Sequence, residues 1–583
     1  MTWLKSHDVL YLSVLAMFVG VLAGYAALLL RSGIEWISLL WTGERSWDAA
    51  IEVLPWYIYL IAPVTAGLIV GFIILRFLPR GELRGVAGVL EDLSERGARV
   101  NPRQMITETL GTAVSTGSGI SLGREGPTVA LGAVISSEIG YRIGLSEKQL
   151  RTLIGCGVAA GIAASFNTPI AGVVFALEII LADYTIATFS PIVIASVIAT
   201  VITRAELGNY PAFIIPEYHL VSAWEIPAYV GLGIFCGLLA TILVKSLAPM
   251  RHFFAKLVPD FRFRPAAAGL ALGLIGVGFP EVMSIGYGTV ESIMLERVDP
   301  QILGIILPIS VFFSLLLAGK LLVTIVCFSG GFPGGMLGPS LFLGAVAGAL
   351  FGGMAHSIAP AYSESYGAYA LVACGALTAA SMQAPMTIIL MVFELSGNYQ
   401  IMLPLMAACI VATIVKRAFG KSSVFTESLE EKGVKTSWML ERSWMRATKV
   451  DQIPWKSIPS VHESTSLEDL KAIYVSSGKG IVLIVDHEEL MVGIVTFSDL
   501  QPWLLDPSLD QVAVASEVAN REVSHVSENS SMLDAIQVFN SEEFEQMLVV
   551  SKDNPRKVLG ILSRNAVFAT YHSLIVEHGE KAQ

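Results

Sequence analysis

Charged residues are scarce in this chain. Only 15% of its 583 residues are Asp, Glu, Lys or Arg, 54% are hydrophobic, and the mean hydropathy is +0.64. In soluble globular proteins about a quarter of the residues are charged. The composition therefore excludes an ordinary soluble protein and indicates a polytopic α-helical membrane protein.

Metal-binding and enzymatic motifs are missing as well. The nine histidines form no HExxH motif, the sequence has no Walker motif, and no nucleophile stands beside a base in the apolar segments. We therefore expect no metal site and no enzymatic activity. Five cysteines stand in apolar surroundings without a CxxC pair, which indicates packed thiols rather than disulfides. They are Cys156, Cys236, Cys327, Cys374 and Cys409.

Long apolar runs are what the chain does have. Four of them, at residues 9–30, 56–78, 228–244 and 302–328, are long enough to span a bilayer as helices. The first is too long for the core of a signal peptide, and no small-residue cleavage site follows it. We therefore expect it to remain as a membrane helix.

The C-terminal part differs in composition from the rest. From Trp444 onward, 20 acidic residues stand against 11 basic ones, and no run could span a membrane. This segment predicts a soluble domain. Nearly all of the net charge of −11 lies there, so the membrane part is close to neutral and its composition does not indicate the sign of a transported ion.

An internal repeat occurs in the membrane part. The stretch "GSGISLGREGPTVALGA" (117–133) resembles "SGGFPGGMLGPSLFLGA" (329–345), and "AASFNTPIAGVVFALE" (163–178) resembles "AASMQAPMTIILMVFE" (379–394). The alternative is that membrane helices rich in small residues look alike. Two motifs in the same order, at offsets of 212 and 216 residues, favour a duplication instead. Duplicated membrane domains with Gly/Pro-broken helices are typical of transporters.

The breaks in these helices favour an anion as the transported species. Pro127 and Pro339 suit the first position of a helix, where a missing N–H costs nothing. The other N–H groups of a first turn are unsatisfied and lie at the positive end of the helix dipole. Two such ends meeting within the membrane would bind an anion through the backbone. Gly334, Gly335 and Gly338 would let the backbone approach the ion closely.

Glu125 stands beside Arg124 at one of these helix ends. An ionised side chain inside a membrane is costly unless it is paired, hydrated or functional. A movable carboxylate there could occupy the site when no anion does, which would make Glu125 a gate and a candidate proton carrier. The alternative is a structural cap, with Glu125 bound to Arg124 or to backbone N–H groups.

The segments "GREGPTV" (123–129), "FNTPIAGVVFALE" (166–178), "GGMLGP" (334–339) and "ELSGNYQIMLPLM" (394–406) resemble the signature segments of the ClC family of chloride channels and chloride/proton antiporters. The resemblance runs from about residue 9 to about 430. It implies the ClC fold, an inverted repeat with discontinuous helices, and a homodimer with one anion pathway per subunit. It also implies multiple passes through the plasma or inner membrane, with cytoplasmic termini.

The resemblance also assigns the anion site. Backbone N–H groups at Met336 and Leu337 would bind the central anion and those around Gly126 the outer one, next to Arg124. Glu125 would be the external gate.

Two side chains depart from the family's pattern. "RGELRG" (80–85) puts Gly81 where the family has a serine, and Phe425 stands where it has a tyrosine. Loss of both hydroxyl donors predicts weaker central binding, because each neutral donor contributes about 1 kcal/mol. Arg80 and Arg84 could compensate by raising the local anion concentration. The alternative is that they are solvated loop arginines.

A third departure concerns coupling to protons. Many antiporters of the family carry an internal proton-transfer glutamate where this chain has Ile179. Some members that lack it are still antiporters. The preceding Glu178 fits a helix-packing role, since Glu394 occupies the equivalent repeat position. Ile179, together with weak central binding, favours uncoupled, channel-like flux.

The tail contains a second repeat, residues 457–500 against 522–567. Each unit predicts a turn, an amphipathic helix and two alternating strands. This resembles a pair of cystathionine-β-synthase (CBS) domains, which often bind adenine nucleotides. Thr496 and Asp499 match the phosphate and ribose positions, whereas the second repeat has Ser563 but Ala566 in place of the aspartate. At most one good ribose site is expected, and a purely structural dimerisation module is the alternative.

Together these features predict an anion transporter with a regulatory tail. The expected domains are a transport domain (1–430), a linker (431–448), two CBS domains (449–508 and 509–575) and a short tail (576–583). The alternatives are an H+/Cl− antiporter and a non-conducting membrane protein that senses adenylates. The expected partners are chloride or a similar small anion, protons in the antiporter alternative, a second copy of the chain and the lipid bilayer, but no nucleic acid. Transport requires no cofactor, and an adenine nucleotide at the CBS pair is the ligand that the resemblance suggests.

Overall fold

A computed structural model gives the fold of the chain, which forms two compact units, Met1–Thr436 and Ser437–Gln583. The expected linker at 431–448 lies almost entirely outside the residues that the structure describes. The described residues are 8–51, 53–78, 83–95, 98–209, 215–216, 218, 222, 225–302, 305–358, 360, 365–431, 445, 448–504, 510, 512–521, 523–542 and 545–580.

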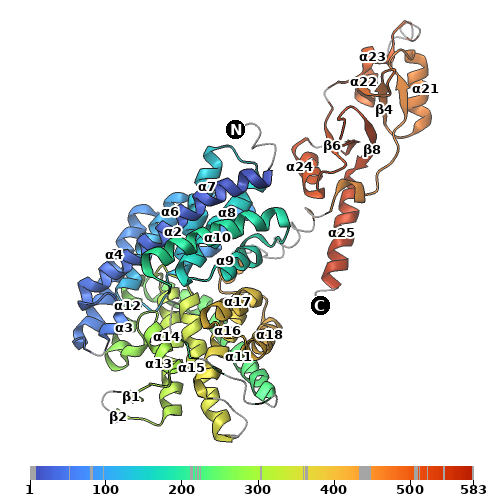
Figure 1. Cartoon of the computed structure of the whole chain (residues 1–583). Coiled ribbons are helices and arrows are strands. Elements are labelled where there is room, and N and C mark those ends of the chain that lie inside the picture. The colour runs from blue at the N-terminus through green and yellow to red at the C-terminus, as the bar shows by residue number, and fades with distance from the viewer. Residues whose placement is uncertain are drawn as a thin grey trace. The chain divides into compact units, whose positions relative to one another are not determined.

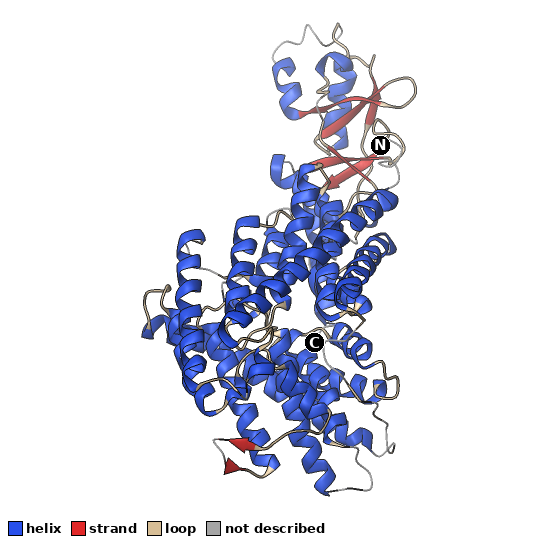
Figure 2. Ribbon diagram, turned by 60° about the vertical axis from the view of Figure 1, so that its left-hand side comes forward, coloured by secondary structure: helices blue, strands red, loops and turns tan. Residues whose placement is uncertain are grey.

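Where the structure describes it, the first unit is helical except for one short hairpin, as Figure 1 and Figure 2 show. Its first half comprises α2 (Asp8–Thr42), α3 (Trp47–Ala50), α4 (Trp56–Phe77), α5 (Gly85–Glu95), α6 (Pro102–Gly117), α7 (Glu125–Arg142), α8 (Glu147–Phe166), α9 (Pro169–Phe175), the π-helical turn η1 (Ala176–Leu181) and α10 (Ile186–Leu207). The second half comprises α11 (Ile226–Leu257), α12 (Arg264–Gly278), the short 3-10 turn η3 (Pro280–Val282), α13 (Tyr287–Met294), β1 (Gln301–Ile302), β2 (Ile305–Ile306), α14 (Ile309–Ser329), α15 (Leu337–Ile358), α16 (Tyr366–Met382), α17 (Pro385–Ser396), α18 (Met402–Phe419) and α19 (Glu427–Glu431).

Eight helical spans among the described residues are long and apolar enough to cross a membrane, and they contain α2, α4, α8, α10, α11, α14, α15 and α18. This agrees with the prediction of a polytopic membrane protein. The predicted span at 302–328 is wrong at its N-terminal end. Strands β1 and β2 form a hairpin there, and helix α14 begins only after Pro308, at Ile309.

Corresponding helices of the two halves pack on corresponding partners: α7 on α8 and α15 on α16, α8 on α10 and α16 on α18, α2 on α10 and α11 on α18. Close backbone approach recurs as well. A Cβ at Gly132 would lie 2.0 Å from the carbonyl oxygen of Gly157, and one at the equivalent Gly344 would lie 2.4 Å from that of Ala373. The repeat seen in the sequence is therefore a repeat of packing.

Two equivalent glutamates cap each other's halves. Glu178 accepts hydrogen bonds from the backbone N–H groups of Met386 and Thr387, at 3.2 and 2.7 Å, in the first turn of α17. Glu394 accepts from the first turn of α9 in the same way, at 2.9 and 2.7 Å. Since carboxylates satisfy the free N–H groups of a helix start, the predicted packing role of Glu178 is confirmed.

The second unit contains two copies of one α/β motif. The first comprises β3 (Ser460–His462), α21 (Leu467–Ser477), β4 (Ile481–Val485), β5 (Met491–Thr496) and α22 (Phe497–Leu500), and the second comprises β6 (His525–Ser527), α24 (Met532–Glu542), β7 (Gln546–Val550), β8 (Val558–Ser563) and α25 (Arg564–Glu580). In both copies the first strand pairs parallel with the second, and the second pairs antiparallel with the third, with an irregularity near the end of the second strand. The short first strands, β3 and β6, were not predicted. Side chains of both sheets share one apolar cluster of Ile481, Leu483, Leu548 and Ile561.

Candidate functional site

The starts of α7 and α15 meet through their backbones. Gly123 donates its N–H to the carbonyl of Gly335 at 2.7 Å, and Gly335 donates to that of Gly123 at 2.6 Å. These two glycines are equivalent in the repeat, 212 positions apart. An antiparallel bridge between equivalent residues implies a local two-fold relation, so two helix N-termini converge at one place.

Both helices begin two residues earlier than predicted. Helix α7 starts at Glu125 and helix α15 at Leu337, so Pro127 and Pro339 are third rather than first residues. The missing N–H groups still cost nothing, because all four N–H groups at a helix start lack an intrahelical partner. The correction places Glu125 in the first turn of α7 instead of ahead of it.

The Glu125 carboxylate is buried at this junction, with 1% of the residue exposed. Its Oε1 accepts a hydrogen bond from the hydroxyl of Tyr287 at 2.7 Å. Its Oε2 is buried without a partner among the described residues, and a Cβ at Gly123 would lie 2.0 Å from it. The carboxylate thus bonds to a neutral hydroxyl. The contact to Tyr287 was not predicted, because nothing in the sequence links two positions 162 residues apart.

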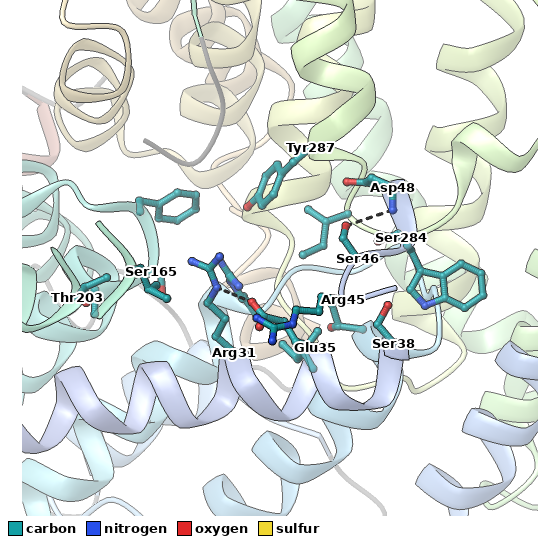
Figure 3. Close-up of a pocket in the computed structure, with 18 of the residues that line it drawn as sticks. Arg31, Glu35, Ser38, Arg45, Ser46, Asp48, Ser165, Thr203, Ser284 and Tyr287 are labelled. Atoms are coloured by element: carbon teal, nitrogen blue, oxygen red, sulfur yellow. Dashed lines mark hydrogen bonds and ion pairs between the residues drawn. The ribbon is translucent and has the colours of Figure 1, made fainter. Parts of the chain in front are cut away.

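A cavity of about 400 Å³ lies beside Tyr287, the hydrogen-bond partner of Glu125 (Figure 3). Arg124, the residue before Glu125, and its partner Tyr287 line this cavity. Four further charged residues line it: Arg31, Glu35, Arg45 and Asp48. Arg31 pairs with Glu35 at 2.8 Å. Three arginines against two carboxylates favour small anions here.

A second cavity, of about 720 Å³, is lined by Gly126, the residue after Glu125. Met336 and Phe425 line it too, so the structure brings these three predicted anion-site residues together. Leu337 is buried beside them as the first residue of α15. Since the residues flanking Glu125 face different cavities, Glu125 stands between the two.

Phe425 lines this second cavity. It stands where the family has a tyrosine, so this position offers no hydroxyl. Its ring packs edge-to-face on Phe175, with 6.3 Å between the centroids. The predicted contributions of Gly81 and Arg80 fall outside the described residues. Arg84 is described, and its guanidinium pairs with Glu91 and with Asp92. The alternative of a solvated loop arginine is wrong, because the side chain is 9% exposed and paired. Arg84 also lines the second cavity, so its effect on the local anion concentration stays a prediction.

Ile179 lies within η1, next to the cap residue Glu178. Its side chain is partly buried and has no group that can carry a proton. A π-helical turn is rare and often marks a functional segment. The position therefore remains of interest although its residue is apolar.

In the second unit, Thr496 and Asp499 come together. The Thr496 hydroxyl donates to the Asp499 carboxylate at 2.6 Å, and the Thr496 N–H donates to the same oxygen at 2.8 Å. The two groups close a capping box at the start of α22. Ser563 of the second copy accepts only the N–H of Ala566, at 3.2 Å, among its described contacts.

Among the described residues, one cluster of metal-ligand types occurs, and it lies in the same unit. His462, Glu463 and His487 each place one ligand atom within 4.8 Å of the others. The two imidazoles share a hydrogen bond of 3.0 Å, and Ser464 bonds the other nitrogen of His462 at 2.7 Å.

Comparison with known protein families gives two matches. The voltage gated chloride channel family matches residues 66–417, which is more than half of the chain. The CBS domain matches twice, at residues 450–506 and 515–573. The family matches and the two units therefore describe the same division into a helical part and a duplicated α/β part.

Individual relatives agree with these matches. A putative chloride channel protein ClcB-like from Ralstonia nicotianae is 33% identical over 65% of this chain and 87% of its own length. Chloride channel protein CLC-f from Arabidopsis thaliana is 27% identical over 94% of this chain and 79% of its own. An H(+)/Cl(−) exchange transporter ClcA from Vibrio parahaemolyticus is 28% identical over 71% of this chain and 88% of its own.

Solved structures share the fold. A slow cyanobacterial Cl−/H+ antiporter has a TM-score of 0.63 at 24% identity, over 73% of this chain and 99% of its own. A eukaryotic CLC transporter has a TM-score of 0.59 at 17% identity, over 95% and 97%. The resemblance seen in the signature segments is confirmed. The chain belongs to the voltage gated chloride channel (ClC) family, whose members transport anions and are not enzymes, and it carries a C-terminal pair of CBS domains.

Proposed function

We propose that this chain transports chloride or a similar small anion along a path joining the two cavities, with the Glu125 carboxylate as the gate. One observation carries the proposal. The buried carboxylate lies where the starts of α7 and α15 meet, and its neighbours in the chain, Arg124 and Gly126, line opposite cavities.

The gate follows from competition for one positive region. Helix N-termini attract negative charge, so the carboxylate and a passing anion compete for the ends of α7 and α15. The hydrogen bond from Tyr287 holds the carboxylate in the closed position. An anion that reaches Gly126 displaces the carboxylate, and protonation of Glu125 would weaken its hold on the site in the same way.

We infer that the flux is uncoupled from protons. Ile179 offers no relay group on the inner side, and Phe425 offers no hydroxyl to hold the anion. The second candidate is H+/Cl− exchange. It is favoured by relatives described as H(+)/Cl(−) exchange transporters, and Glu125 itself could carry a proton.

The CBS pair is proposed to be cytoplasmic, to regulate transport and to bind an adenine nucleotide at Thr496 and Asp499. CBS domains commonly bind such nucleotides. A homodimer with one pathway per subunit, and the domain limits expected from the sequence, belong to the same proposal.

Chloride efflux from proteoliposomes, recorded together with external pH, tests the gate. Wild type is compared with Glu125→Ala and with Glu138→Gln, a control that removes a carboxylate of α7 paired with Arg142. We expect chloride flux without proton movement in wild type, and faster, pH-independent flux in Glu125→Ala. Stoichiometric proton uptake that Glu125→Ala abolishes would establish exchange instead. Absence of all anion flux, with nucleotide binding retained, would favour a sensor and overturn the transport proposal.

A further inference from the structure

A third helix start faces the second cavity, of about 720 Å³. Helix α5 begins at Gly85, and its next two residues, Val86 and Ala87, line the cavity. A Cβ at Gly126 would lie 3.7 Å from a methyl group of Val86, so the start of α5 lies against the start of α7. By the same reasoning as for α7 and α15, this end should attract an anion.

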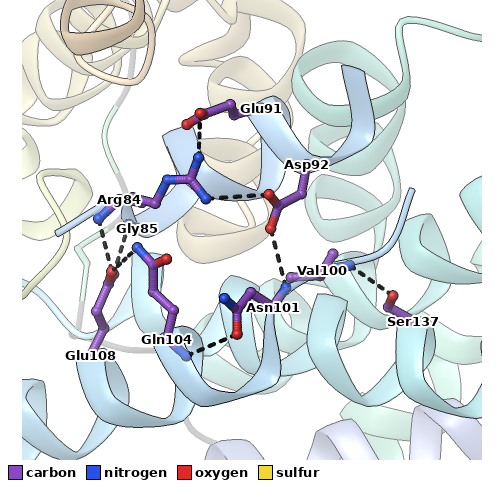
Figure 4. A network of polar contacts seen from close by, with 9 residues as sticks. All are labelled: Arg84, Gly85, Glu91, Asp92, Val100, Asn101, Gln104, Glu108 and Ser137. Atoms are coloured by element: carbon purple, nitrogen blue, oxygen red, sulfur yellow. Dashed lines mark hydrogen bonds and ion pairs between the residues drawn. The ribbon is translucent and has the colours of Figure 1, made fainter. Parts of the chain in front are cut away.

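The chain itself already places a carboxyl group at this end. Glu108 of α6, 4% exposed, accepts hydrogen bonds from the backbone N–H groups of Arg84 at 2.8 Å and Gly85 at 2.7 Å (Figure 4). Gln104 adds an amide N–H to the same carboxylate at 3.1 Å. Gly85 has a φ of +49°, which favours glycine. Glu108 also lines the cavity.

Among the described residues no cationic side chain is hydrogen-bonded to Glu108, although the charge of Arg84 is close enough to act on it. The guanidinium of Arg84 binds Glu91 and Asp92, and only the backbone N–H of Arg84 reaches Glu108. Figure 4 therefore shows one cation among three carboxylates. Elsewhere on the cavity wall, Arg251 pairs with Glu427 and Glu431, and Arg264 donates to the backbone carbonyls at 258 and 259.

We propose that Glu108 acts as an internal anion that occupies the start of α5 and thereby lowers the affinity of the second cavity for chloride. This inference rests on the proposed transport function and names a residue that sets its anion affinity. A carboxylate that holds two N–H donors both removes them from a passing ion and repels that ion. Weak binding suits rapid passage, because a tightly held ion leaves slowly.

A structural cap is the competing explanation. The network continues from Asp92 to the N–H of Asn101, at 3.2 Å, and from Asn101 to the N–H of Gln104, at 3.4 Å, so it also ties α5 to α6. A cap alone affects stability. An occupant of the anion path affects chloride affinity as well, and this difference can be measured.

The test is chloride binding by titration calorimetry on the purified full chain, for wild type, Glu108→Gln, Glu108→Ala and the control Glu138→Gln. Hydrogen bonds to charged groups are stronger than neutral ones, so we expect chloride to bind roughly tenfold more tightly in both Glu108 variants. The control should match wild type. A dissociation constant that stays within about a factor of two of wild type, or no measurable binding in any form, would overturn the proposal.

Two further measurements keep the result interpretable. If the Glu108 variants do not fold, bromide soaked into wild-type crystals still tests the proposal: bromide at the N–H groups of Arg84 and Gly85, beside an unmoved Glu108, would overturn it. Chloride efflux in Glu125→Ala distinguishes a failure of the Glu108 proposal from a failure of the proposed gate. An unchanged affinity in Glu108→Gln, with faster flux in Glu125→Ala, would reject the role of Glu108 and leave the gate standing.

Discussion

In the proposed gate, contacts of single atoms hold the Glu125 carboxylate in the closed position. Oε1 has one donor, the Tyr287 hydroxyl, and Oε2 lies against the unsubstituted Cα of Gly123. The closed position therefore depends on an absent side chain as much as on a present one. The proposed gate needs a carboxylate with few hydrogen bonds, because the same group has to leave the site when an anion passes.

Gly123→Ala should open the gate without touching Glu125. The new Cβ would lie 2.0 Å from Oε2, and the flexible end of the glutamate must shift because real contacts are never so short. We expect chloride efflux from proteoliposomes to rise from the wild-type rate towards that of Glu125→Ala. Gly353→Ala is the matched control, since a Cβ at that helical glycine meets nothing within 4 Å. A wild-type rate in Gly123→Ala would contradict this account of the closed state.

The sequence predicted part of this site and missed the rest for a physical reason. Gly126, Met336 and Phe425, which line one cavity, could be named because each belongs to a local motif or lies at a fixed offset from one. The hydrogen bonds of Tyr287 and Glu108 join α13 to α7 and α6 to α5. Such contacts leave no local pattern, so a single sequence does not reveal them.

At the scale of helices, each half of the repeat caps a helix of the other half. Glu178 binds the start of α17 and Glu394 binds the start of α9, so each half supplies the cap that the other needs. The sequence predicted equivalent roles from equivalent spacing, Pro169 to Glu178 and Pro385 to Glu394. It did not show that the two caps are exchanged, because exchange depends on the two-fold relation between the halves.

Glu178→Gln and Glu394→Gln should each destabilise the transport unit by a similar amount. The loss of a charged cap costs about 1–2 kcal/mol, and near-symmetric contacts should give near-equal losses. Thermal unfolding of the purified protein, followed by tryptophan fluorescence, would show a lower midpoint in both variants. Glu206→Gln, an exposed carboxylate of α10, is the control. A lower midpoint in only one variant would show that the two caps are not equivalent in energy.

At the scale of the molecule, two duplicated units share one chain but differ in what their repeats produce. In the transport unit both copies contribute a helix end to one site. In the CBS unit only the first copy has both Thr496 and Asp499, whereas the second has Ser563 and Ala566. We therefore expect one nucleotide per chain.

Asp499 has to serve two functions if that nucleotide binds, because it already accepts from the N–H and the hydroxyl of Thr496. Asp534 closes the same capping box with Ser531, at 2.9 and 2.7 Å, at the start of α24. Asp499→Ala and Asp534→Ala thus remove the same kind of helix cap, but only Asp499→Ala removes a candidate ribose ligand. The pair separates the loss of a cap from the loss of a ligand.

Calorimetric titration of ATP into the purified full chain is expected to show saturable binding in wild type and Asp534→Ala, and at least tenfold weaker binding in Asp499→Ala, since a lost pair of charged hydrogen bonds exceeds 1.4 kcal/mol. ATP should also change the chloride efflux rate of wild type but not that of Asp499→Ala. Equally weaker ATP binding in both variants would indicate that Asp499 acts only as a helix cap. No binding in any form would overturn the nucleotide site and favour the alternative of a purely structural dimerisation module.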